Sequence, residues 1–168
     1  KVKIMPLQGL DSVKKMIAKN KKESNVKVRG VFLAGLKNII EGTPVGLTQS
    51  ELPKSVTSTS GFHRNNWFLS VKFPSRLVGR NAADSGSGSF LSAATMPGYV
   101  LNKKIYFSNN SPAINTLEKG GFPNPVKKGT RVKGNTYQKL SSGGFSKQAP
   151  SGWVRKTLIA MANKIRSL

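Results

Sequence analysis

Apolar positions recur at helical spacing twice in the first 45 residues. The first set follows Asp11 and Ser12, which can cap a helix, and it predicts a short helix over about residues 12–21. The second set predicts another helix that starts after Ser24 or Asn25 and ends near Gly42. The first set is Leu10, Val13, Met16 and Ile17, and the second is Val28, Val31, Phe32, Gly35, Leu36 and Ile39.

The middle of the chain changes to strand patterning. Residues 67–73 alternate between apolar and more polar positions, which is typical of a half-buried strand, and residues 103–108 predict a second strand. Ser111 as a cap and Pro112 at the first helical position then predict a short helix that ends at Gly120 and Gly121. Residues 82–92 are rich in Gly and Ser and predict no regular element.

The last 18 residues carry the clearest helical pattern of the chain. Apolar residues spaced by three and four predict a helix of about 27 Å from Ser151 onward, with the basic side chains on its other side. The stripe consists of Val154, Leu158, Met161, Ile165 and Leu168.

These elements predict an α+β fold. We expect N-terminal helices and a long C-terminal helix to pack on a small antiparallel β-sheet, within a single domain over residues 1–168. Extended loops are expected at about 43–62, 75–101 and 120–149, where Gly, Pro, Ser and Thr accumulate without a period.

Composition excludes cysteine chemistry and indicates where the chain is assembled. The chain has no cysteine, so disulfides, thiolate metal sites and cysteine nucleophiles are excluded. Its apolar runs are too short to cross a bilayer and follow no signal-peptide pattern, so we expect no membrane partner and assembly in the cytoplasm.

Charge is the strongest compositional signal. The chain has 28 Lys and Arg against 6 Asp and Glu, a formal net charge of +22, and the excess is spread along its length. Such a chain should bind an anionic partner, which could be nucleic acid, an acidic protein surface or an anionic membrane.

Catalytic chemistry has little support. His63 is the only histidine, and the six acids are scattered singly, without the pairing that acid–base work or a metal site requires. The Gly-rich steps lack the Gly-Lys-Ser/Thr ending of a phosphate-binding loop. We therefore predict no enzyme and no catalytic, cofactor-binding or metal-binding residue. Trp67 and Trp153 could stack on bases, although core burial is the commoner role of such amphipathic positions.

Several segments together resemble the head-to-tail joining, or tail-completion, family of long-tailed bacteriophages. The matching runs are Gly9-Leu10, Thr43-Pro44-Val45, Gly61, Asn66-Trp67, 105–112, 117–125 and, most specific, 144–152 with the sequence Gly-Phe-Ser-Lys-Gln-Ala-Pro-Ser-Gly. The chain departs from the family pattern where Gly46 starts a longer insertion after Val45, and where Ala113-Ile114 replaces an aromatic step.

The resemblance implies a structural virion protein at the head-proximal end of the tail. We expect a homo-oligomer, a ring of six copies, that completes the tail, contacts the tail tube or tail terminator and the head connector, and surrounds the channel through which the genomic DNA passes.

Two groups of residues are the predicted contacts. The expected interface residues are Phe122, Phe145, Gln148, Arg155, Lys156 and Ile159, and the expected contacts with channel DNA or an acidic partner are Lys127, Lys128, Arg131 and Lys133. The alternative is a free, non-specific basic DNA-binding protein, whose affinity would fall steeply with salt.

Overall fold

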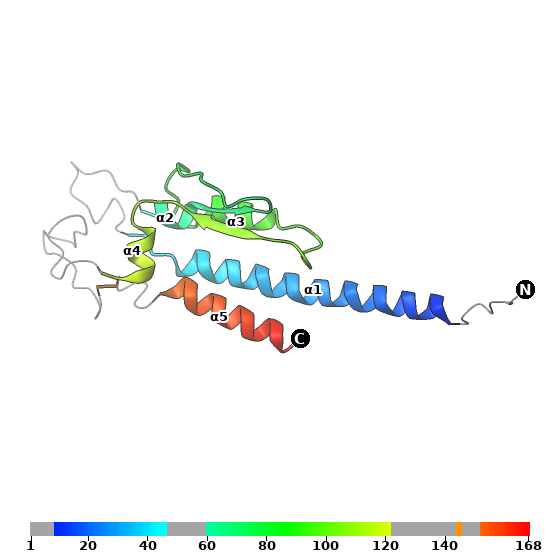
Figure 1. Ribbon diagram of the computed structural model, residues 1–168. Coiled ribbons are helices and arrows are strands. Elements are labelled where there is room, and N and C mark those ends of the chain that lie inside the picture. The colour runs from blue at the N-terminus through cyan, green and yellow to red at the C-terminus, as the bar shows by residue number, and fades with distance from the viewer. Residues whose placement is uncertain (1–8, 47–59, 122–143, 146–151) are drawn as a thin grey trace, which may run out of the picture.

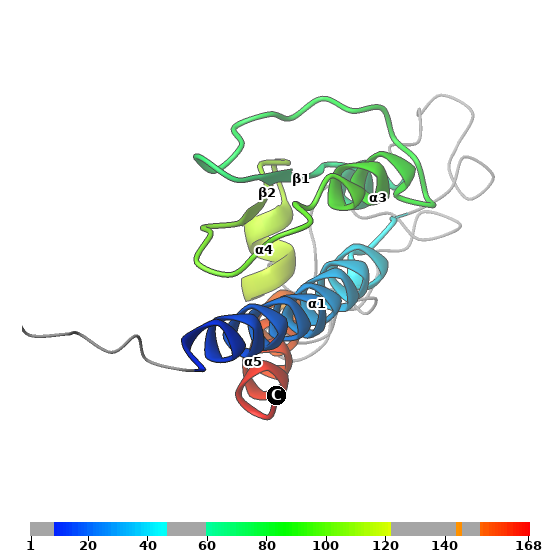
Figure 2. The same ribbon diagram turned by 90° about the vertical axis from the view of Figure 1, so that its right-hand side faces the viewer.

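A computed structural model describes residues 9–46, 60–121, 144–145 and 152–168. A long helix, α1 (Leu10–Gly42), runs through the middle of the described part of the chain, with α5 (Trp153–Arg166) beside its C-terminal half (Figure 1). The other side is covered by a two-stranded sheet together with α2 (Phe62–Asn65) and α3 (Ser87–Ala94), while α4 (Ile114–Lys119) lies at the C-terminal end of α1 and contacts α5. Seen along its axis in Figure 2, α1 lies between these two groups.

The two predicted N-terminal helices are one continuous helix of 33 residues, about 50 Å long. The predicted break was wrong because no Gly or Pro stands between residues 10 and 29. Asp11 and Ser12 lie inside the helix, whose N-cap is Gly9. Asn25, expected near a helix start, uses its side chain elsewhere: it donates to Gly98 O (2.8 Å) and accepts from Val100 N (2.7 Å).

Strands β1 (Trp67–Ser70) and β2 (Tyr106–Asn109) pair antiparallel, with Trp67 opposite Asn109. The strand predicted over 67–73 ends early because the Ser70 hydroxyl donates to Phe73 O (2.6 Å) and closes a turn. Phe73 is consequently exposed instead of buried. The Trp67 ring stacks on that of Phe107, with centroids 5.0 Å apart, so Trp67 serves the core.

Helix α3 lies where no regular element was predicted. Its many Ser and Gly residues are typical of loops, and the helix is stabilised by tertiary contacts. The hydroxyl of Ser89 accepts a hydrogen bond from Trp67 N (2.9 Å), and that of Ser92 accepts one from Leu69 N (2.9 Å). The two serines therefore bind backbone amides of β1. The predicted loop over 75–101 contains this helix.

The core forms where α1 meets the sheet and α3. Leu36, Ile39 and Ile40 from α1 pack with Trp67, Met96 and Val100. The α+β prediction is confirmed, with one N-terminal helix in place of two. No helix in the part of the chain that the structure describes is long and apolar enough to span a membrane.

Candidate interaction surface

The first half of α1 projects beyond the other helices and strands (Figure 1). Every residue from 9 to 24 is exposed, and Asn25 is the first buried residue of the helix. We call residues 10–24 the arm; at 1.5 Å per residue it is about 22 Å long. Its apolar residues Leu10, Val13, Met16 and Ile17, the arm stripe, are each about half exposed.

The arm is basic around this stripe. Its five lysines and two acids leave a net charge of +3. Asp11 lies 4.0 Å from Lys14, and Glu23 lies 4.0 Å from Lys19, both as exposed helical pairs. Exposed pairs of this kind contribute little stability, so the arm presents a half-exposed apolar stripe within a positive surface.

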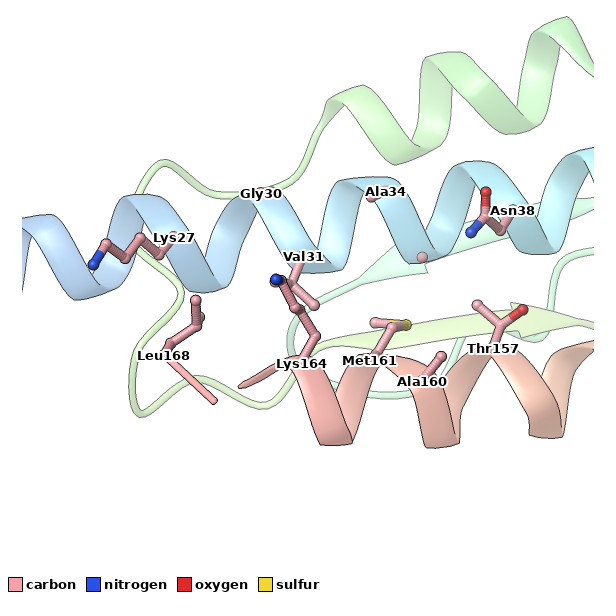
Figure 3. A pocket seen from close by; sticks show the side chains of 11 residues that line it. Lys27, Gly30, Val31, Ala34, Asn38, Thr157, Ala160, Met161, Lys164 and Leu168 are labelled. Carbon is pink, nitrogen blue, oxygen red and sulfur yellow. The ribbon is translucent and has the colours of Figure 1, made fainter. Parts of the chain in front are cut away.

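Further along α1, a shallow groove of about 430 Å³ follows its contact with α5 (Figure 3). Small residues from both helices line it, namely Gly30, Ala34, Gly35 and Ala160, and the side chains of Lys27 and Lys164 also border it. We call it the α1–α5 groove. Its lining is mostly apolar, and it opens to solvent at the end of α5 where Leu168 lies.

Helix α5 carries three of the predicted interface residues on its exposed side. Arg155 and Lys156 are exposed, and 56% of the Ile159 surface is accessible. Leu158 is also 52% exposed, which contradicts its predicted place in a buried stripe. Only Met161 of that stripe is buried, where it packs against Gly35 of α1.

Two sets of hydrogen bonds at the N-terminal turn of α5 hold this helix in position. Glu118 of α4 accepts hydrogen bonds from Val154 N (3.0 Å) and Arg155 N (2.9 Å), which places a carboxylate at the helix N-terminus. The Trp153 indole donates to Ile39 O (2.9 Å). The sequence analysis predicted neither contact, because each joins residues far apart in the chain. Glu118 and Val154 are 36 residues apart, and Ile39 and Trp153 are 114 residues apart.

Of the remaining predicted contact residues, the structure describes Phe145 alone. Phe145 is half-buried, and its interface role stays a prediction. The other predicted residues lie outside the described residues, and for them the prediction stands as it was made: Phe122, Gln148, Lys127, Lys128, Arg131 and Lys133.

Two residues of the family-like runs, Thr43 and Trp67, are in contact at the C-terminal end of α1. Thr43 accepts from the Trp67 indole (2.9 Å) and donates to Ile39 O (2.7 Å), and it is fully buried. The Arg64 guanidinium donates to the carbonyls of Glu41 (2.8 Å) and Thr43 (2.9 Å), where carbonyls at a helix C-terminus lack helical partners. These contacts give the Thr-Pro-Val and Asn-Trp steps a structural role.

His63 has a hydroxyl partner that the sequence did not indicate. Its Nδ1 lies 2.7 Å from the Ser111 hydroxyl, which donates to Asn109 Oδ1 (2.6 Å). With its hydrogen directed to Asn109, Ser111 accepts from His63, whereas a nucleophilic serine would donate to the histidine. Ser111 is also 2% exposed, so the pair links α2 to the segment after β2. Desolvation by burial lowers the pKa of His63.

No cluster of three or more metal-ligating side chains occurs among the residues that the structure describes. Comparison with protein-family models, with curated proteins and with solved structures found no match. The candidate contact surfaces of the described residues are the arm, the α1–α5 groove and the outer side of α5.

Proposed function

We propose that this chain is a structural virion protein that joins head and tail in a long-tailed bacteriophage. In this role six copies form a ring that completes the tail, contacts the tail tube or tail terminator on one side and the head connector on the other, and leaves a central channel for DNA. The chain acts through surfaces and without catalysis.

One observation carries the proposal: two helices expose apolar side chains within basic surroundings. The arm presents four half-exposed apolar residues, and α5 presents Leu158 and Ile159 beside Arg155. Exposed apolar positions grouped on rigid helices suit protein contacts more than catalysis. The family-like runs in the sequence support the same role.

Charge favours acidic neighbours in such an assembly. Six copies would each bring +22 to a ring around DNA, and the repulsion would oppose assembly unless acidic proteins or DNA phosphates offset it. Basic residues on α5 would then set partner choice and encounter rate.

The test of location is immunogold electron microscopy of intact and tail-only particles with an antibody against this chain. Gold confined to the head-proximal end of the tail is the expected result. Label along the tail would discard the placement, and absence from well-labelled particles would discard the virion role.

The contribution of α5 is tested by charge reversal. The double variant Arg155→Glu with Lys156→Glu should reduce head-to-tail joining in a complementation assay. The matched control is Lys103→Glu with Lys104→Glu, an equal charge change on an exposed loop. Equal joining by both double variants would remove Arg155 and Lys156 from the interface.

A free, non-specific DNA-binding protein is the second candidate, because the charge of +22 alone suffices for phosphate binding. Under this alternative the logarithm of the DNA association constant falls linearly with the logarithm of salt, while the protein is missing from particles. Both measurements together separate the two functions.

A further inference from the structure

The arm stripe and the α1–α5 groove lie on one face of α1. Val31 and Ala34, which line the groove, follow Ile17 and Val13 by 14 and 21 residues. In a helix of 3.6 residues per turn these steps leave each pair within about 60° of one another. Spacings that are multiples of seven are also those of a surface that a second helix can follow.

Helix α5 occupies only the inner part of this face. It ends beside Lys27 and Gly30, where Leu168 reaches the groove (Figure 3). Beyond that point no described helix or strand covers the face along the arm, where Val13 and Ile17 are each 48% exposed. The exposed stripe therefore continues the side of α1 that α5 covers.

The arm by itself has little to keep it helical. Its 15 residues are at the length at which an isolated helix is marginal in water, and its ion pairs are exposed. A helix laid along the stripe would bury the four apolar side chains and stabilise the arm. The small residues Gly30 and Ala34 would let the same helix approach α1 closely at the groove.

Charge decides which helix fits. A second copy would bring another +22 and another lysine-rich arm, so like charges would face each other along the stripe. A lipid surface suits the stripe less well, because helices that lie on membranes bury broad faces rich in Trp, Phe and Leu, whereas this stripe has one Leu and no aromatic residue. Lysines on the arm and around the groove instead favour carboxylates beside the incoming apolar residues.

We propose that the arm stripe and the outer α1–α5 groove dock one amphipathic helix of a different protein, with Asp and Glu flanking its apolar positions. The proposal deepens the joining function and rests on it for the setting, since the partner would be an acidic component of the tail or head connector.

The experiment is a fluorescence titration of the full chain with a labelled synthetic helix of three heptads, about 21 residues, with Leu at its two core positions and Glu beside them. Two control peptides accompany it, one of the same composition in scrambled order and one with Lys in place of Glu. Binding of the acidic peptide at least tenfold tighter than either control is expected, and it should weaken as salt is raised from 0.1 to 0.5 M, a change that shortens the Debye length about twofold.

The chain offers a matched pair of variants. Val13→Asp places a charge in the stripe, and Val26→Asp makes the same change at a 64% exposed position on the same helix. Val26 follows Ile17 by nine residues, which is about 180° around the helix. Val13→Asp should weaken binding at least tenfold while Val26→Asp leaves it unchanged, with circular dichroism verifying that both retain their helix content.

Other outcomes would overturn the proposal. They are equal binding of all three peptides, equal loss in both variants, or sedimentation velocity showing self-association that Val13→Asp abolishes, which would make a second copy the occupant. Binding to anionic phosphatidylserine vesicles that is lost in Val13→Asp, without peptide binding, would make the occupant a membrane. Because the titration uses purified chain, its failure is distinguishable from a failure of particle labelling.

Discussion

The two halves of α1 have similar apolar spacing but opposite surroundings. In the second half, Leu36, Ile39 and Ile40 are almost completely buried against the sheet and α3. In the first half, the arm residues at the same spacing remain in solvent. Amphipathic spacing thus marks a face that can be covered, but whether this chain covers it depends on what the rest of the chain brings alongside.

The largest contrast is expected from equal truncations in the two halves. Ile40→Ala removes a fully buried side chain and should lower the free energy of unfolding by about 2–5 kcal/mol. Ile17→Ala removes a half-exposed one and should change it by less than about 0.5 kcal/mol. Urea denaturation measures both. Similar losses would mean that the arm is packed in solution.

The contact with α5 is the next most sensitive point. A Cβ at Gly35 would overlap the Met161 thioether, so Gly35→Leu should separate α5 from α1 and cost about 3 kcal/mol. Gly30 has open space around it, and there the same substitution should be neutral or stabilise by up to about 1 kcal/mol. Thermal unfolding of the two variants tests the difference, and an unaffected Gly35→Leu would contradict the packing of α5.

The boundary between the halves lies at Asn25. Asn25→Ala leaves the Val100 amide without its acceptor and should cost about 1–3 kcal/mol. Asn20→Ala, five residues earlier on the exposed arm, should be neutral or slightly stabilising because Ala favours helices. Hydrogen exchange at Val100 gives a local readout: faster exchange is expected in Asn25→Ala alone.

The smallest expected effect is the pH dependence of stability that His63 causes, away from the arm. Burial holds the pKa of His63 below the ordinary value of about 6.5, so the unfolded chain binds a proton first as pH falls. The contribution of neutral His63 to the free energy of unfolding is therefore complete above about pH 6.5. It is lost on acidification toward the pKa of His63 in the folded chain, by at most about 1.4 kcal/mol per pH unit.

Unfolding measured between pH 7.5 and 5.5 should show this slope in the wild type and a flatter curve in His63→Gln. Carboxylates titrate mainly below this window. A wild-type stability that rises on acidification would show that His63 gains a proton on folding, contrary to its buried position.

Local sequence patterns identified most of the elements, and the helix that they missed depends on distant contacts. The helix at the C-terminus and the strand beginning at Trp67 follow from periodicity alone. Residues 87–94 were missed as a helix because Ser89 and Ser92 read as loop residues, although their hydroxyls serve the backbone of β1. Such hydrogen bonds join residues more than 20 positions apart and leave no local signal.

The candidate site divides in the same way. Sequence alone determined the charge, the apolar stripes and the exposed basic residues Arg155 and Lys156 on the last helix. Only the tertiary structure decided that the first stripe stays uncovered, that Leu158 faces solvent, and that α5 ends partway along α1. Composition and periodicity are properties of neighbouring residues, whereas burial is settled by which distant segments pack together and where they stop.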